Sequence, residues 1–304
     1  MYNTQHALTL LLAGLVVGCA SNSPGQGDAD GGTASCSEGA SADDCPPFTN
    51  GVSTLAGAAD AGFVDGSRKA ARFANPVNVA FRDGMLYVAD FDNSKLRVID
   101  TSTHVTRTVI AQQGFQRPFG MAFASDGTLY VSTDNGPTGA HDPMSGTIWR
   151  VDVNAQLATV VASTIGRPRG LAVLPDGRIA VADYLHHVIE LVDPKTGKAT
   201  TIAGAFDASG MVDGPGPTAR FSTPYSIVVR SDGKLIVADY ANNRLRLVAL
   251  DGTTSTLSGT GDPGYADGAM ATARYYHPQA MSAAASGNIY LTDLGNFRVR
   301  RIVG

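Results

Sequence analysis

Charged residues are scarce in this chain: Asp, Glu, Lys and Arg make up 16% of its 304 residues, and the formal net charge is −4. The acidic excess lies in residues 1–47, which contain five acidic side chains and no Lys or Arg. The remainder carries 23 basic and 22 acidic side chains. Such a balanced surface lacks the basic field that neutralises phosphates, so we expect no nucleic-acid partner.

The apolar run at residues 7–17 is too short to cross a bilayer, because a transmembrane helix needs about 20 apolar residues. Its length is typical of an export signal. Residues 16–19, Val-Val-Gly-Cys, resemble the bacterial lipobox, which implies cleavage before Cys19 and acylation of that cysteine. No Lys or Arg precedes the run, which departs from such signals, and an ordinary export signal with an incidental cysteine is the alternative.

Residues 1–18 are therefore predicted to be a lipoprotein signal peptide and residues 19–50 a lipidated, flexible stalk rich in Gly, Ser, Ala and Asp. Several acyl chains would anchor the protein stably in the bacterial cell envelope, with no other membrane contact. No Asp follows Cys19, which favours the outer over the inner membrane. Of three cysteines, Cys36 and Cys45 then remain as a predicted disulfide; a metal site there would lack histidines.

The rest of the chain, residues 51–304, contains one pattern five times. Each copy has a proline, an apolar strand, a turn with glycine, a strand ending near Asp, and a strand that usually combines Arg with aliphatic residues. The turn glycines are 43, 50, 56 and 54 residues apart, which predicts an all-β chain with one four-stranded blade per copy. We expect the turns to be two-residue hairpins. The five prolines are Pro76, Pro118, Pro168, Pro224 and Pro278.

These copies resemble the NHL-repeat family of β-propellers, most clearly at DFDNSKLRVID (90–100), DYANNRLRLVALDG (239–252) and DLGNFRVRRIVG (293–304). The resemblance covers residues 51–304 and implies a single propeller. Five blades are counted, and six is the alternative because six is more usual in that family. VSTLAG at 52–57 matches the fourth strands at 199–204 and 253–259, so we expect the N-terminal strand to complete the last blade and close the ring.

Two sets of polar residues recur from copy to copy and are interpreted as structural rather than catalytic. The first comprises strand-end aspartates that can bond to nearby backbone N–H groups, with arginines seven residues on in three copies; its members are Asp90, Asp183, Asp239, Asp293, Arg97, Arg246 and Arg300. The second comprises arginines expected to hold the long connections between blades, namely Arg72, Arg220 and Arg274.

Candidate functional residues are sought where the repeat changes. The second copy contains a polar insertion at 135–143, and the third has paired histidines and Glu190 where three other copies have Arg. Zinc-type side chains in these neighbouring blades are His141, Asp142, His186 and His187. The alternative is that they are simply solvated.

One face of the propeller is expected to carry the loops between blades and the loops after each second strand. Aromatic and Arg side chains often dominate binding energy, so this face is the candidate binding surface; packing between blades is the alternative role for its rings. Its residues are Phe91, Phe119, Arg167, Arg169, Tyr184, Tyr225, Tyr240, His277 and Gln279. Arg117, directly before Pro118, is expected on the same face.

The favoured hypothesis is a monomeric binding or scaffold module for an envelope protein, a glycan or a small ligand, without a cofactor or catalysis. The chain has no P-loop, nucleophile elbow, metalloprotease motif or dinucleotide fingerprint. The alternative is a metal-dependent enzyme resembling gluconolactonases or peptide-amidating lyases, with its site in the central channel. The expected channel positions are small or weakly polar: Asn78, Gly120, Gly170, Ser226 and Ala280.

Overall fold

The computed structural model describes residues 54–303. The predicted signal peptide, the cysteines at 19, 36 and 45, and the whole predicted stalk lie outside the described residues. Within residues 54–303 no helix is long and apolar enough to span a membrane.

Five antiparallel sheets form the blades, which are numbered here in chain order. Blade 1 has β1 (Pro76–Arg82), β2 (Met85–Asp90), β3 (Lys95–Asp100) and β4 (Thr106–Ile110). Blade 2 has β5 (Pro118–Phe123), β6 (Leu129–Thr133), β7 (Thr147–Asp152) and β8 (Leu157–Ser163). Blade 3 has β9 (Pro168–Val173), β10 (Ile179–Asp183), β11 (Val188–Val192) and β12 (Ala199–Ala203). Blade 4 has β13 (Pro224–Val229), β14 (Leu235–Asp239), β15 (Arg244–Val248) and β16 (Thr254–Ser258).

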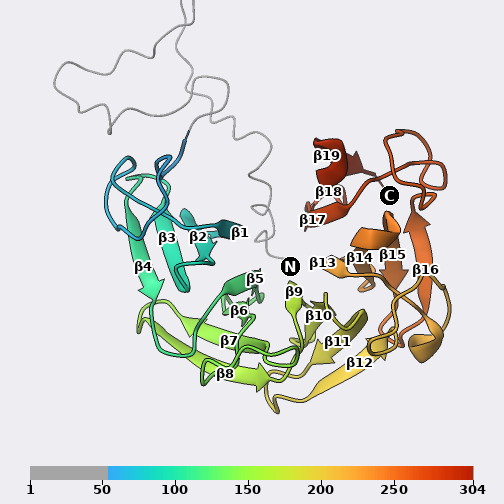
Figure 1. The fold of residues 1–304 in the computed structure, drawn as a ribbon, viewed down its shortest axis with the longest axis horizontal. Helices are drawn as coiled ribbons and strands as arrows, with labels where there is room; N and C mark the ends of the chain where they lie inside the picture. The colour runs from blue at the N-terminus through green and yellow to red at the C-terminus, as the bar shows by residue number, and fades with distance from the viewer. Residues whose placement is uncertain (1–53, 304) are drawn as a thin grey trace, which may run out of the picture.

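Blade 5 has three described strands, β17 (Pro278–Ala283), β18 (Ile289–Asp293) and β19 (Arg298–Ile302). Three short 3-10 segments, η1 (Gly216–Thr218), η2 (Tyr240–Asn242) and η3 (Leu294–Asn296), lie in the connections. The predicted all-β propeller with five blades is confirmed, and the first strand of every blade begins at its repeat proline. These first strands lie toward the centre of the arc (Figure 1).

The hairpins between the first two strands differ from the prediction in four blades. Asp83 and Gly84 both have positive φ and form a two-residue turn in blade 1. In blade 2 the N–H of Ala124 donates to the carbonyl of Thr128, which leaves a three-residue loop. Blades 3 to 5 repeat this arrangement, and only the glycine then has positive φ, because a three-residue loop needs the left-handed conformation at one position.

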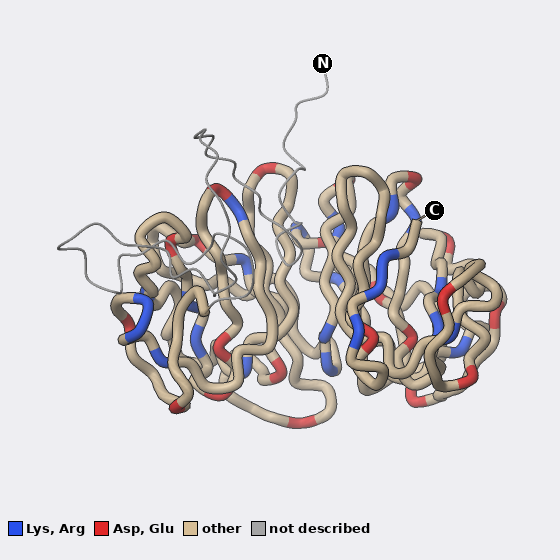
Figure 2. Tube along the Cα trace, turned by 90° about the horizontal axis from the view of Figure 1, so that it is seen from above, with Lys and Arg blue, Asp and Glu red and all other residues tan. Residues whose placement is uncertain are grey.

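Packing between neighbouring blades forms the core. Each of four buried apolar clusters joins one pair of consecutive blades, such as the cluster of blades 1 and 2 around Phe115 and Trp149. Lys and Arg positions are interspersed with Asp and Glu positions along the Cα trace (Figure 2). The core therefore follows the repeat, with each blade buried mainly by its neighbours.

Blades 5 and 1 face each other across the open part of the arc (Figure 1). Val299 on β19 is 70% exposed, whereas the equivalent Leu96 and Leu245 are fully buried. Gly57 donates its N–H to the carbonyl of Arg68, as Gly204 and Gly259 do to their own loops after a fourth strand. Residues 54–57 nevertheless form no described strand, and residues 51–53 lie outside the description, so ring closure stays a prediction.

Candidate functional site

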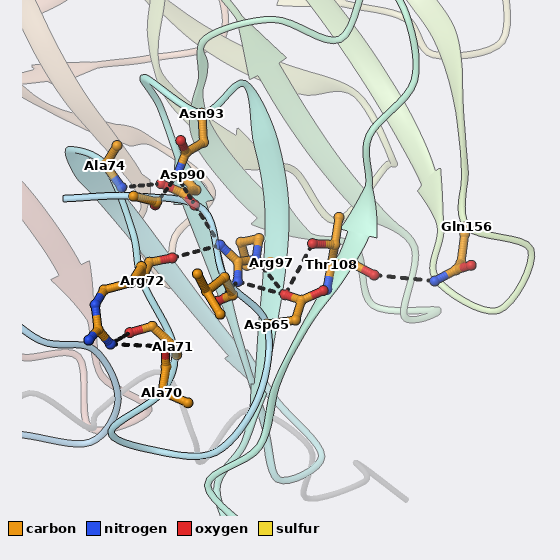
Figure 3. Close-up of polar contacts among 12 residues, drawn as sticks. Asp65, Ala70, Ala71, Arg72, Ala74, Asp90, Asn93, Arg97, Thr108 and Gln156 are labelled. Carbon is orange, nitrogen blue, oxygen red and sulfur yellow. Dashed lines mark hydrogen bonds and ion pairs between the residues drawn. The ribbon is translucent and has the colours of Figure 1, made fainter. Parts of the chain in front are cut away.

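The recurring Asp–Arg pairs are buried structural contacts (Figure 3). In blade 1 the guanidinium of Arg97 is fully buried and uses all five N–H groups. It contacts Asp90 at 2.8 Å and Asp65 at 2.6 Å, and it donates to the carbonyls of Val64 and Arg72. The pair thus fastens the strands of the blade to the preceding interblade loop.

Blades 4 and 5 repeat this network. Arg246 lies 2.7 Å from Asp239, and Arg300 lies 2.8 Å from Asp293. The other carboxylate oxygen of each aspartate accepts a backbone N–H two residues before the repeat proline. These contacts agree with a structural role for both residue types.

Blades 2 and 3 replace this pair with different chemistry. In blade 2, Trp149 occupies the arginine position and donates its indole N–H to Thr133 at 2.9 Å. In blade 3, Glu190 occupies the arginine position, and the partner of Asp183 is His186, with 2.6 Å between Nδ1 and Oδ2. Burial and the charge of Asp183 raise the pKa of Glu190 to about 7, so this carboxyl group takes up protons near neutral pH.

The four candidate metal ligands each have separate surroundings. His186 pairs with Asp183, and Nδ1 of His187 accepts the N–H of Thr223 at 3.1 Å. Asp142 accepts the N–H of Met144 in its own turn. His141 lies beside the guanidinium groups of Arg117 and Arg167. Within residues 54–303 no three His, Cys, Asp or Glu side chains are grouped so that they could hold a metal ion.

The small residues of the inner strands allow close contact between blades. A Cβ atom built on Gly120 would lie 2.8 Å from the carbonyl oxygen of Arg169, and one on Gly170 would lie 2.9 Å from the backbone N of Ile227. These distances are shorter than ordinary van der Waals contacts, so glycine is required where neighbouring inner strands approach. The two glycines therefore serve packing.

The predicted binding surface forms one connected set of rings across blades 1 to 5. Ring centroids are 6.0 Å apart for Phe91 and Phe119, and 5.7 Å apart for Phe119 and Tyr225. Tyr225 in turn lies 5.6 Å from both Tyr184 and Tyr240. We call the surface formed by these five rings together with His277, Gln279, Arg167 and Arg169 the loop face.

The loop face continues beyond these rings on both sides. His277 stacks on Tyr240 at 4.4 Å, and the side chain of Gln279 bonds to Tyr225. On the other side, the guanidinium of Arg169 lies 4.0 Å from the ring centre of Phe119. Arg167 and Arg169 both form ion pairs with Oδ2 of Asp134. All nine residues predicted for the face are therefore brought together or linked by one intermediate residue.

Burial divides these residues between packing and accessible roles. Phe91 and Phe119 are buried, as the packing alternative requires, whereas the three tyrosines, both arginines, His277 and Gln279 are partly exposed. Burial also raises the pKa of Tyr225, so its hydroxyl stays protonated at neutral pH. The accessible part of the face thus offers ring faces, guanidinium groups and hydrogen-bonding groups.

One member of the site, Asp134, was not among the residues predicted from sequence, whereas Arg117 was expected on this face. Asp134 is 1% exposed and lies 3.0 Å from Arg169 and 3.5 Å from Arg167. Arg117 lies over the ring of Phe91 at 5.0 Å. The sequence signal for Asp134 was its position directly after LYVST, because Phe91 directly follows LYVAD in blade 1. The strand registers match, since Pro118 pairs with Thr133 as Pro76 pairs with Asp90.

Sequence and structure comparisons support an NHL-type β-propeller. No protein-family profile matches the chain. It is 30% identical to NHL repeat-containing protein 2 of Bos taurus over 169 residues, covering 48% of this chain and 22% of that protein. It is 25% identical to SUPPRESSOR OF QUENCHING 1 of Arabidopsis thaliana over 285 residues, covering 79% of this chain and 26% of that protein. The chain thus spans about a quarter of the length of these relatives.

A solved structure gives the same indication of fold. An auxiliary nutrient binding protein from Bacteroides thetaiotaomicron superposes with a TM-score of 0.54 at 20% identity, covering 82% of this chain and 75% of that one. Residues 54–303 thus have a β-propeller architecture, and part of the chain is similar in sequence to an NHL repeat-containing protein.

Proposed function

We propose that this protein is a binding module whose loop face takes an envelope protein, a glycan or a small ligand without catalysing a reaction. One observation carries the proposal: partly exposed Tyr184, Tyr225 and Tyr240 form a continuous surface with Arg169 at its edge. Rigid aromatic and guanidinium groups supply large contact areas at low entropic cost. The nutrient-binding structural neighbour supports a binding role of the same general kind.

The module is held at the cell envelope by lipid on Cys19, with residues 19–50 as a spacer and Cys36 joined to Cys45. Intact-mass measurement of the protein extracted from membranes tests this arrangement. A mass increase equal to acylation at Cys19, absent in Cys19→Ser, is expected. An unmodified N-terminal peptide would contradict the anchor.

The binding role is tested with full-length protein on an array of glycans and cell-wall fragments, together with pull-down from envelope extract. The double variant Tyr184→Ala/Tyr240→Ala removes two partly exposed rings of the loop face. Tyr290→Ala is the matched control, because Tyr290 is a partly buried tyrosine near the hairpin end of β18, away from this face.

We expect a ligand that the wild type and Tyr290→Ala both retain and that the double variant loses by tenfold or more, with its melting curve unchanged. Equal retention by the double variant would remove the loop face from the proposal. Absence of any specific ligand for the wild type in both experiments would contradict the binding role itself.

A further inference from the structure

Basic groups outnumber acidic ones where blade 2 meets blade 3. Arg117 and Arg167 each precede a repeat proline, and Arg169 follows one. The carboxylate that contacts this group is Asp134, whose Oδ2 lies 3.0 Å from Nη2 of Arg169 and 3.5 Å from Nη1 of Arg167. Arg167 and Arg169 thus share one carboxylate partner, and the nearby Asp183 accepts the backbone N–H of Arg167.

Several guanidinium N–H groups here have no acceptor within the protein. Nε of Arg167 and Nη1 of Arg169 are buried and unpaired, and one acceptor of the cluster, Oδ1 of Asp134, is buried and unpaired as well. Nη1 of Arg117 and Nη2 of Arg167 both approach Nε2 of His141, at 3.0 and 3.2 Å. Because one imidazole nitrogen has one lone pair, it accepts a strong hydrogen bond from only one of them. The cluster therefore has more donors than acceptors, and an unpaired buried donor is costly.

Aromatic rings fix the guanidinium planes. Arg169 lies 4.0 Å from the ring centre of Phe119, 5.7 Å from Phe91 and 5.9 Å from Tyr184. Arg117 lies 5.0 Å from Phe91. Rings that hold a guanidinium by its face leave its N–H edge for a ligand, and that edge matches the two oxygens of a carboxylate or phosphate.

The insertion at residues 135–143 brings His141 over these arginines. Asn135 is 4% exposed and donates to Gln116 and to the carbonyl of Gly139, which ties the insertion to the loop that carries Arg117. His141 itself is exposed. Its imidazole occupies N–H groups that an incoming oxyanion would use, so binding requires it to move aside.

We propose that the cluster of Arg117, Arg167 and Arg169 binds an oxyanion, a carboxylate or a phosphate, carried by a small ring-shaped ligand such as an acidic sugar. The ring of the ligand lies against Tyr184 and Tyr225, which contact each other at 5.6 Å. This inference rests on the proposed binding role of the loop face and names its ligand class. The oxyanion accepts the unpaired guanidinium donors, and the tyrosine faces contact the C–H groups of the ring.

Binding is measured by calorimetry on the full-length protein with three probes: glucuronate, glucose 6-phosphate and glucose. We expect at least one charged probe to bind tenfold or more tightly than glucose, with affinity falling as salt rises. Glucuronate alone would identify a carboxylate, and glucose 6-phosphate alone a phosphate. Either result supports the oxyanion site.

Three variants separate this site from general binding. Arg117→Gln removes a guanidinium that does not pair with Asp134, and it should weaken the charged probe tenfold or more. Arg117→Lys keeps the charge without the planar edge and should give an intermediate loss. His141→Ala removes the competing imidazole and should strengthen binding severalfold. The control is Arg230→Gln, which breaks the exposed pair with Asp232 in a blade 4 hairpin and should change nothing.

Charged probes that bind no better than glucose in both the wild type and His141→Ala would overturn the oxyanion site. So would a charged-probe affinity unchanged by Arg117→Gln. The two proposals can fail separately. If the charged probes fail but the Tyr184→Ala/Tyr240→Ala variant still loses the ligand found on the array, the binding role of the loop face stands and only the oxyanion ligand class is wrong.

Discussion

Removing Arg246 should strongly destabilise the propeller, because it leaves a buried carboxylate without its countercharge. Arg246 is fully buried and donates five hydrogen bonds, to Asp239, to Asp213 and to the carbonyls of Val212 and Arg220. Removal of one partner of a buried ion pair typically costs about 3–5 kcal/mol. We expect Arg246→Ala to lower the free energy of unfolding by about this amount.

The loss should depend on pH in a defined direction. Burial raises the pKa of Asp239 to about 6, against the lowering effect of Arg246. Without Arg246 the folded-state pKa rises further, and a raised carboxyl pKa removes stability as pH increases toward that value. The difference between wild type and Arg246→Ala should therefore be larger at pH 8 than at pH 6.

Denaturant unfolding of the full-length protein at both pH values measures this effect. The double variant Asp239→Asn/Arg246→Met removes both charges and should recover about half of the loss or more, because a neutral pair avoids the uncompensated charge. Arg178→Ala breaks an exposed pair with Asp176 and should cost about 0.5 kcal/mol or less. A pH-independent loss, or a double variant as unstable as Arg246→Ala, would refute the reasoning.

Two further predictions concern blade 3 and the open part of the arc. Because the folded-state pKa of Glu190 is about 7 and its ordinary value is 4.5, the unfolded state loses this proton first as pH rises. Glu190 should therefore remove about 3 kcal/mol of stability between these pH values, and Glu190→Gln should abolish that slope in denaturant unfolding; equal slopes for both proteins would contradict it. Deletion of residues 51–57 should lower the melting temperature by about 5 °C or more or abolish the single transition, whereas deletion of residues 21–27 should not. An unchanged melt after the first deletion would exclude ring closure by this segment.

The fold was predictable because every blade repeats the same local signals. A proline and a turn glycine recur in all five blades and a strand-end aspartate in four, and the first strands begin at the five repeat prolines. The turn type was predicted less well: Asp-Gly occurs in both two- and three-residue loops, and the flanking strand register decides between them. Ring closure depends on contacts between distant ends, about which local patterns carry little information.

The candidate site was predictable only in part, for a reason visible at Asp134. The nine predicted loop-face residues were found from their positions relative to repeat prolines and strand ends, and these positions are periodic. Asp134 stands one residue after a strand end, the position that Phe91, Tyr184 and Tyr240 hold in blades 1, 3 and 4. Its acidic side chain breaks the aromatic pattern by which the face was found. Its contact with Arg169 joins residues 35 positions apart, which no local pattern encodes.

Blades 2 and 3 depart from the repeat both inside and on the loop face. Inside, Thr133 with Trp149 and Asp183 with His186 replace the Asp–Arg pair that fastens blades 1, 4 and 5. On the loop face, the same junction carries the arginine cluster and the insertion with His141. The repeat arginines Arg97, Arg246 and Arg300 are buried and donate to several protein acceptors. At the junction of blades 2 and 3, Arg167 and Arg169 each keep a buried unpaired donor, as Arg274 does in the loop before blade 5. This combination is what separates a binding cluster from the structural arginines of the repeat.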